Sequence, residues 1–190
     1  MAGPVKSADT KLARHTEAAH HPWIILGIDP GKTSGWAIYD ATRNLAVSSG
    51  EFTGDALPSE AVPITVSVCV VEVPVGQGPT YPDVVRAGVV AGQLHERLRS
   101  VMETHFLERL AIRQRLTTAV HGIFRVTNDP TAWRAVKLIL CGREDCDLRG
   151  SKKLGREPGP LAHVKGKDAR AALAAAVAWT LPAHIPTQAP

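Results

Sequence analysis

The sequence lacks a long apolar run and has only three cysteines, and each scarcity argues against a class of protein. No stretch approaches the roughly 18 apolar residues that a membrane-spanning helix requires, so no membrane partner is expected. Residues 1–21 contain no apolar segment that would serve as a signal-peptide core. An odd number of cysteines fits a reducing cytoplasm better than a disulfide framework.

The composition is that of a folded chain. Hydrophobic residues make up 44% of the 190 residues and charged residues 21%, which is enough apolar material for one buried core. We expect flexible tails at residues 1–22 and 182–190 around a single domain at residues 23–181. The net charge of +4 permits nucleic-acid binding without demonstrating it. Basic residues outnumber acidic ones two to one between residues 134 and 170, which indicates either a nucleic-acid contact or a solvated loop.

Hydrophobic patterning predicts strands that come first and then alternate with helices. The predicted strands are residues 23–28, 35–39, 44–53, 64–73 and 120–126. The predicted helices are residues 83–106, 107–118, 130–141 and 167–181, the third with Asp129 as its N-cap. Within the first helix, Ala87, Gly88, Ala91 and Gly92 are expected to form one close-packing patch. This order predicts an α/β fold around a sheet of mixed strand directions.

Two acidic residues stand where buried strands are predicted to end. Asp29 follows an apolar run and precedes Pro30-Gly31, and Glu72 ends a second apolar run before Pro74. Gly31-Lys32-Thr33 is not a phosphate-binding P-loop, because that motif needs four residues before its Gly-Lys pair and Gly27 leaves only three. If the strands are parallel neighbours, two carboxylates about 5 Å apart repel by roughly 3 kcal/mol, which a shared proton or a cation must offset.

A third acid, Asp168, opens the last predicted helix, where an acid is also a common N-terminal residue. With it, three motifs occur in order: Gly27-Ile-Asp-Pro-Gly-Lys-Thr-Ser-Gly-Trp-Ala37, Val70-Val-Glu-Val-Pro74 and Lys167-Asp-Ala-Arg-Ala-Ala-Leu-Ala-Ala-Ala-Val177. Together they resemble the motifs of RuvC-type Holliday junction resolvases, and the resemblance spans residues 24–179. The ordered set of three is far more specific than any one motif.

The resemblance implies an RNase H-like fold, with a mixed five-stranded sheet flanked by helices. It also implies that Asp29, Glu72 and Asp168 bind Mg²⁺ or Mn²⁺, two ions in the active arrangement, which suits the preference of hard cations for carboxylate oxygens. The implied activity is hydrolysis of phosphodiester bonds in four-way or branched DNA by a homodimer. Residues expected to contact DNA are Lys152, Lys153, Lys165, Gln77 and Thr80.

The chain departs from the family in its last motif, which usually supplies two ligands three residues apart. Aligning Asp168 with the first ligand places Ala171 at the second, and aligning it with the second places Lys165 at the first. His163 is the remaining candidate for the missing ligand. Alternative functions are therefore a nuclease of this fold acting on flaps or RNA–DNA hybrids, and a nucleic-acid-binding protein with impaired catalysis. An actin-like ATPase is disfavoured because that class normally uses two such lobes.

Overall fold

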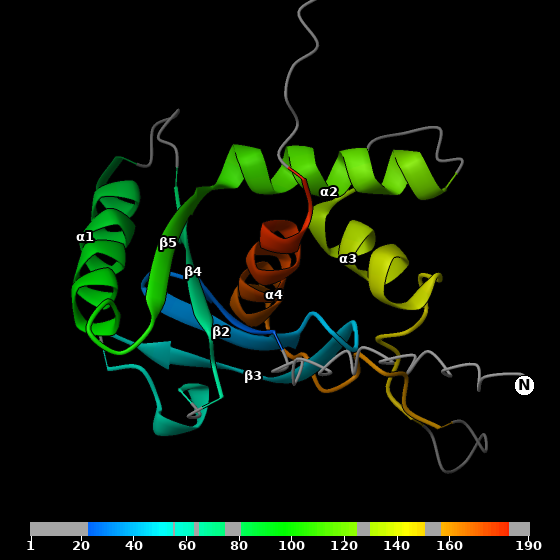
Figure 1. Ribbon diagram of the computed structural model, residues 1–190, viewed down its shortest axis with the longest axis horizontal. Helices are drawn as coiled ribbons and strands as arrows, with labels where there is room; N and C mark the ends of the chain where they lie inside the picture. The colour runs from blue at the N-terminus through cyan, green and yellow to red at the C-terminus, as the bar shows by residue number, and fades with distance from the viewer. Residues whose placement is uncertain are drawn as a thin grey trace, which may run out of the picture.

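The computed structural model describes residues 23–54, 56–62, 65–74, 81–124, 130–150 and 157–182. Its sheet contains five strands: β1 (Ile24–Asp29), β2 (Thr33–Asp40), β3 (Leu45–Thr53), β4 (Val68–Val73) and β5 (Glu103–Glu108). Four helices accompany them, α1 (Tyr81–Leu98), α2 (Arg109–Ile123), α3 (Ala132–Cys141) and α4 (Lys167–Thr180), together with a short 3-10 turn at Ser59–Ala61. Figure 1 shows their arrangement.

The strand order is β3-β2-β1-β4-β5. The first three strands form an antiparallel meander, whereas β4 and β5 run parallel to β1. The tight connection between β2 and β3 uses Asn44, whose φ of 54° lies in the left-handed region that Asn tolerates, and Tyr39 Oη donates to its side chain at 2.7 Å. This order and these directions are those of the RNase H-like fold, so the predicted fold class is confirmed.

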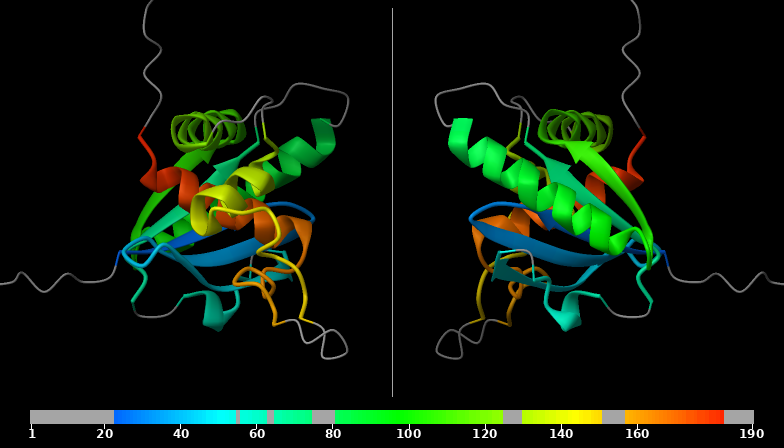
Figure 2. Two further views of the ribbon diagram at one scale, coloured as in Figure 1. Left: turned by 90° about the vertical axis from the view of Figure 1, so that its right-hand side faces the viewer. Right: turned by 90° about the vertical axis from the view of Figure 1, so that its left-hand side faces the viewer.

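Helices pack on both faces of the sheet, and each face has its own hydrophobic core, called here the α1 core and the α4 core. α1 lies against one face, and α2, α3 and α4 gather on the other (Figures 1 and 2). Alternation along β1 divides its side chains between the two cores: Leu26 and Ile28 pack in the α1 core, whereas Ile25 packs in the α4 core. The central strands are therefore buried on both faces, which explains their near-continuous apolar sequence.

The helix α4 lies unusually close to the sheet because two glycines face it. A Cβ atom on Gly27 would lie 2.0 Å from the carbonyl oxygen of Ala172, and one on Gly35 would lie 2.0 Å from the carbonyl carbon of Asp168. The alanines of α4 complete this close packing, since Ala169 and Ala172 are fully buried. The two glycines thus set the distance between the start of α4 and the ends of β1 and β2.

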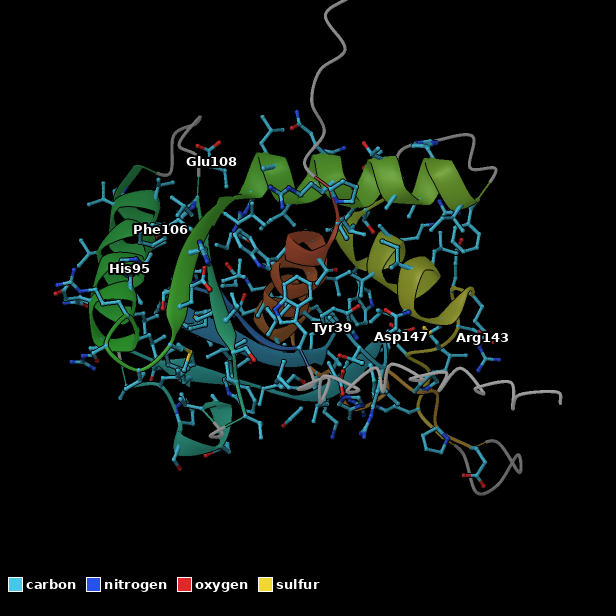
Figure 3. The ribbon with its side chains drawn as sticks, in the orientation of Figure 1. Tyr39, His95, Phe106, Glu108, Arg143 and Asp147 are labelled. Carbon is cyan, nitrogen blue, oxygen red and sulfur yellow. The ribbon has the colours of Figure 1, made fainter. Side chains whose placement is uncertain are left out.

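The fifth strand was predicted in the wrong place. Helix α1 ends at Leu98, not at Phe106, and residues 103–108 form β5, whereas Val120–Ile123 belong to α2. The chain turns at residues 98–102 without Gly or Pro, through backbone hydrogen bonds from Val101 and Met102 to Leu98 O, so no breaker residue marks the change. Phe106 on β5 then stacks on His95 of α1, with ring centroids 4.6 Å apart (Figure 3).

Smaller differences concern element ends and one patch. Helix α3 begins at Ala132 with Thr131 as its N-cap, whose hydroxyl accepts from Arg134 N, and the predicted cap Asp129 lies outside the described residues. The small residues of α1 do not form one patch, because Ala87 and Ala91 are buried against the sheet while Gly88 and Gly92 are exposed.

The predicted tails at residues 1–22 and 182–190 lie outside the described residues, apart from Pro182. Among the helices that the structure describes, none is both long and apolar enough to span a membrane.

Candidate active site

Asp29 and Glu72 end two adjacent parallel strands on the same face of the sheet. Alternation places Asp29 on the α4 side together with Ile25, and Glu72 on that side together with Val70. The register between β1 and β4 pairs Ile28 with Val71, and one further step brings the two acids side by side. Both residues are buried, with 8% and 3% of their surface exposed. The carboxyl ends of parallel strands are where open α/β sheets collect their functional groups.

Asp168 reaches the same place from the first turn of α4. Gly35 pairs with Asp29 across β1 and β2, and the close approach of α4 sets the Asp168 backbone directly on Gly35. Asp29, Glu72 and Asp168 all line one pocket of about 420 Å³. An adjoining pocket of about 460 Å³ shares Asp29 and Asp168 and extends over the β1–β2 turn. The three acids predicted from the sequence are therefore brought together from three separate elements.

An arginine that the sequence reasoning missed bridges the two buried acids. Arg109 is the first residue of α2, directly after Glu108 ends β5, at the junction labelled in Figure 3. Its Nε donates a hydrogen bond to Glu72 Oε1, and its Nη2 lies 3.5 Å from Asp29 Oδ1. The guanidinium supplies positive charge to a pair of carboxylates that would otherwise repel each other.

The surroundings favour the protonated form of all three acids. Burial, reinforced by the charge of Glu72, raises the pKa of Asp29 to about 7, even though Arg109 acts in the opposite direction. Burial also raises the pKa of Glu72 against the lowering effect of Arg109. The pKa of Asp168 is raised as well, by burial and then by the charge of Glu51. A site in which carboxylates are held at such a cost is a candidate for cation binding or proton transfer.

Glu51 is a fourth acid near this site, and the sequence reasoning did not single it out. It lies on β3 opposite Gly35, which in turn lies opposite Asp29, so the row continues across the sheet. Its side chain is exposed and lies against Gly166, just before α4. Sequence alternation alone could not identify Glu51, because its position depends on the register between β2 and β3.

With Asp168 as the first ligand of the last motif, the position of the missing ligand is filled by an alanine. Ala171 lines the pocket three residues after Asp168. His163 and Lys165 are exposed in the segment before α4 and do not line either pocket of the acids. The other predicted DNA contacts, Lys152, Lys153, Gln77 and Thr80, lie outside the described residues.

Other basic side chains surround the acids instead. Arg113 lines the pocket of about 420 Å³ that holds all three acids, called the inner pocket below, and Lys32 lines the adjoining outer pocket of about 460 Å³. Lys167 lines both. Lys167 adjoins Asp168 in the sequence, so the last motif itself could have drawn attention to it. Arg109 could have been found only by placing a strand end at Glu108, where a parallel strand delivers the next residue to the functional edge of the sheet.

A second polar cluster connects the first turn of α4 to α3. Asp147, in the segment after α3 (Figure 3), accepts a hydrogen bond from Trp133 Nε1 at 2.8 Å and one from Lys137 Nζ at 3.2 Å. Arg170 of α4 lies 3.8 Å from Asp147 and stacks over Trp133 at 5.0 Å. Since Arg170 is two residues from Asp168, the cluster ties the N-terminal end of α4 to α3.

We expect Asp147→Asn to lower the free energy of unfolding by about 1.5–3 kcal/mol at pH 7, because it weakens charge-assisted hydrogen bonds. Burial alone would raise the pKa of Asp147, but hydrogen bonds from Trp133 and Lys137 outweigh it and leave that pKa below its usual value. The stabilisation is therefore present above the unfolded pKa near 3.9 and is lost as the pH falls through the folded value.

Urea unfolding at pH 7 and at pH 3 measures this effect. Asp145→Asn is the matched control, since Asp145 and its partner Arg143 are 63% and 62% exposed and their ion pair contributes little. An equal loss of stability in the two variants at pH 7 would contradict the role given to Asp147.

The donor atoms of the site suit a hard divalent cation, although the side chains are not gathered around one. The buried carboxylates of Asp29 and Glu72 both contact the guanidinium of Arg109, which supplies the positive charge between them. In this arrangement no three His, Cys, Asp or Glu side chains of the described ranges lie close enough together to hold a metal ion. The fold and the site together define an RNase H-like α/β protein with a carboxylate pocket at the carboxyl edge of its parallel strands.

Comparisons with known proteins add few relatives. No protein-family model and no curated protein sequence matches the chain. Among solved structures, it is similar to Thermus thermophilus RuvC in complex with a Holliday junction substrate, at 12% identity and a TM-score of 0.46, covering 82% of this chain and 91% of that one. A second Thermus thermophilus RuvC structure matches at 13% identity and a TM-score of 0.46, with 82% and 92% covered. At these values the similarity adds nothing to the fold assignment that the strand order provides.

Proposed function

We propose that this protein is a metal-dependent nuclease that hydrolyses phosphodiester bonds in branched DNA, with the four-way junction as its leading substrate. The observation that carries the proposal is the convergence of Asp29, Glu72 and Asp168 on one pocket from β1, β4 and α4. Burying two carboxylates side by side is costly and needs a compensating purpose. Binding of a divalent cation supplies one, and the motifs that carry these acids resemble those of junction resolvases.

The metal would be Mg²⁺ or Mn²⁺, held by oxygens of Asp29, Glu72 and Asp168, with room for a second ion. Bound ions of this kind activate water for attack on a phosphodiester and stabilise the leaving oxygen. The protein's own contribution is to hold the carboxylates on rigid strand and helix ends and to exclude water from their inner side, where Ile112 and Ala174 line the pocket.

The DNA backbone would be held by the basic residues around the pocket. Arg113, Lys32 and Lys167 line its walls, and Lys165 is exposed nearby. Lys152, Lys153, Gln77 and Thr80 are proposed to extend this contact from the neighbouring segments of the chain. Contacts of this type bind phosphates without reading sequence, so the affinity should fall steeply with salt concentration.

A homodimer would place two such sites on two opposed strands of a junction. The outward face of α1 is a candidate for the interface, because Val85, Gly88, Val89 and Gly92 are all exposed there. Small and β-branched residues on one helical face allow a second helix to approach closely.

One observation favours a second candidate function, nucleic-acid binding with impaired catalysis. The missing ligand position falls on Ala171 or, in the other alignment, on Lys165, and neither His163 nor Lys165 lines the pocket. A nuclease of the same fold that cuts flaps or RNA–DNA hybrids is the other alternative, since the acids do not define the shape of the substrate.

Cleavage assays on a labelled four-way junction, a flap, a linear duplex and an RNA–DNA hybrid distinguish these functions. We expect Mg²⁺- or Mn²⁺-dependent cleavage, fastest on the four-way junction and absent when the ion is chelated. Binding of the junction without cleavage of any substrate would favour the impaired protein. If the flap or the hybrid is cleaved faster than the four-way junction, that nucleic acid is the preferred substrate and the junction is not.

A further inference from the structure

Arg109 reaches the acid pair from the solvent side. Its side chain is 64% exposed, whereas the side chains of Asp29 and Glu72 are 12% and 4% exposed. The acids are fixed on central strands, but the arginine extends from the first turn of a helix at the rim of the pocket. The guanidinium is therefore the part of this ion-paired group that has room to move.

The atoms that Arg109 contacts are the ones that a metal ion would need. It engages Oδ1 of Asp29 and Oε1 of Glu72, and both of these residues line the pocket. A guanidinium and a divalent cation compete for these oxygens, because their positive charges repel each other and both use the same lone pairs. The acids themselves are also not gathered around a metal position, since no three His, Cys, Asp or Glu side chains within the described part of the chain could hold an ion together.

We propose that Arg109 is an internal counter-ion that closes the acid pair in the metal-free protein and that a divalent cation must displace it. This inference rests on the proposed function, because it concerns the same site. In the closed state the guanidinium stabilises two buried carboxylates that would otherwise be left without a partner. In the open state the cation takes over that role, and Arg109 moves toward Arg113 and Lys167 at the wall of the pocket, where a phosphate would be bound.

The closed state weakens metal binding by a calculable factor. When only a fraction of the molecules is open, the apparent dissociation constant is the intrinsic one divided by that fraction. If Arg109 closes nine molecules in ten, its removal tightens metal binding about tenfold. A purely structural arginine would behave in the opposite way, since its loss would disorder the acids and weaken binding.

Titration of Mn²⁺ into the full-length protein, followed by isothermal calorimetry, tests the proposal. We expect Arg109→Met to bind Mn²⁺ about tenfold more tightly than the wild type and Arg109→Lys to fall between them. The matched control is Arg113→Met, which removes the same charge from the same helix and pocket and should change the affinity less than threefold. Equal tightening in both methionine variants would overturn the proposal, because a general loss of positive charge would then explain it.

Thermal unfolding supplies a second readout if calorimetry is limited by folding of the variant. Without metal, Arg109→Met should unfold at a lower temperature than the wild type, and Mn²⁺ should raise its melting temperature by more than it raises that of the wild type. An equal or smaller rise would overturn the proposal.

Failure of this inference can be told apart from failure of the proposed function. Mn²⁺ binding that needs Asp29 but is not tightened in Arg109→Met removes this inference alone, whereas absence of Mn²⁺ binding in every variant removes the proposed function as well.

Discussion

Replacing Asp29 by Asn is expected to abolish cleavage while making the metal-free protein more stable. Asn keeps the shape of the side chain but cannot supply the anionic oxygen that a hard cation requires. We expect the cleavage rate to fall by about 10³-fold or more, which corresponds to roughly 4 kcal/mol of lost transition-state stabilisation. Any cleavage that survives the substitution at near wild-type rate would overturn the assignment of the site.

The stability effect follows from the raised pKa of Asp29. The folded pKa is about 7 against an ordinary aspartate pKa of 3.8, so between these values the folded state binds more protons than the unfolded state. The contribution of Asp29 to stability therefore decreases as the pH rises from about 4 to about 7. At 1.36 kcal/mol per pH unit the loss has an upper bound of about 4 kcal/mol. Asn removes this loss because it carries no charge at any pH.

Denaturant unfolding of the metal-free proteins at pH 5 and pH 8 measures this effect. Asp29→Asn should exceed the wild type in stability by more at pH 8 than at pH 5. The control is Asp83→Asn, which removes an exposed carboxylate from the wall of the outer pocket and should leave cleavage within about threefold of the wild type. If Asp29→Asn is less stable than the wild type at pH 8, the attraction of Arg109 for the Asp29 carboxylate outweighs the cost of burying that charge, and the prediction is wrong.

The parts of the site that the sequence predicted are those that local patterns determine. Asp29 and Glu72 each follow an apolar run and precede turn-forming residues, so their positions at strand ends could be read from the sequence alone. Asp168 could be assigned to the site only because its motif follows the motifs of Asp29 and Glu72 in the order seen in the resolvase family. Their common location in one pocket follows from the parallel pairing of β1 with β4, which the fold class already implied.

The parts that the sequence did not predict depend on tertiary structure. Glu51 approaches Asp168 only through the register of β3 on β2, a relation that no local pattern encodes. The position of Arg109 at the site was not predicted, because residues 103–108 were divided between the predicted helices 83–106 and 107–118, so no strand end was expected before it. That segment alternates charged and apolar residues weakly, and its strand form is stabilised by pairing with β4 and by stacking of His105 on Trp179. Long-range packing decided the structure there, against the helical preference of the neighbouring sequence.

The close approach of α4 leads to the second large expected effect, at Gly35. We expect Gly35→Ala to lower the free energy of unfolding by about 1–3 kcal/mol and to slow cleavage about 10²-fold. The new Cβ would lie 2.0 Å from the carbonyl carbon of Asp168 and 2.4 Å from the backbone nitrogen of Ala169. Ordinary contact requires more than 3 Å, so the first turn of α4 must move outward by about an ångström and carry Asp168 away from Asp29.

Urea unfolding and single-turnover cleavage, both well below the melting temperature of the variant, separate the two consequences of this movement. Gly122→Ala on α2 is the matched control, because Gly122 is exposed and a Cβ there would meet nothing within 4 Å. Alanine also favours a helix by up to about 1 kcal/mol, so this control should be neutral or stabilising and fully active. Wild-type cleavage by Gly35→Ala would mean that the distance between α4 and the sheet does not set the geometry of the acids. Loss of cleavage at a temperature where the variant is folded would instead identify Gly35 as the residue that holds Asp168 within reach of Asp29.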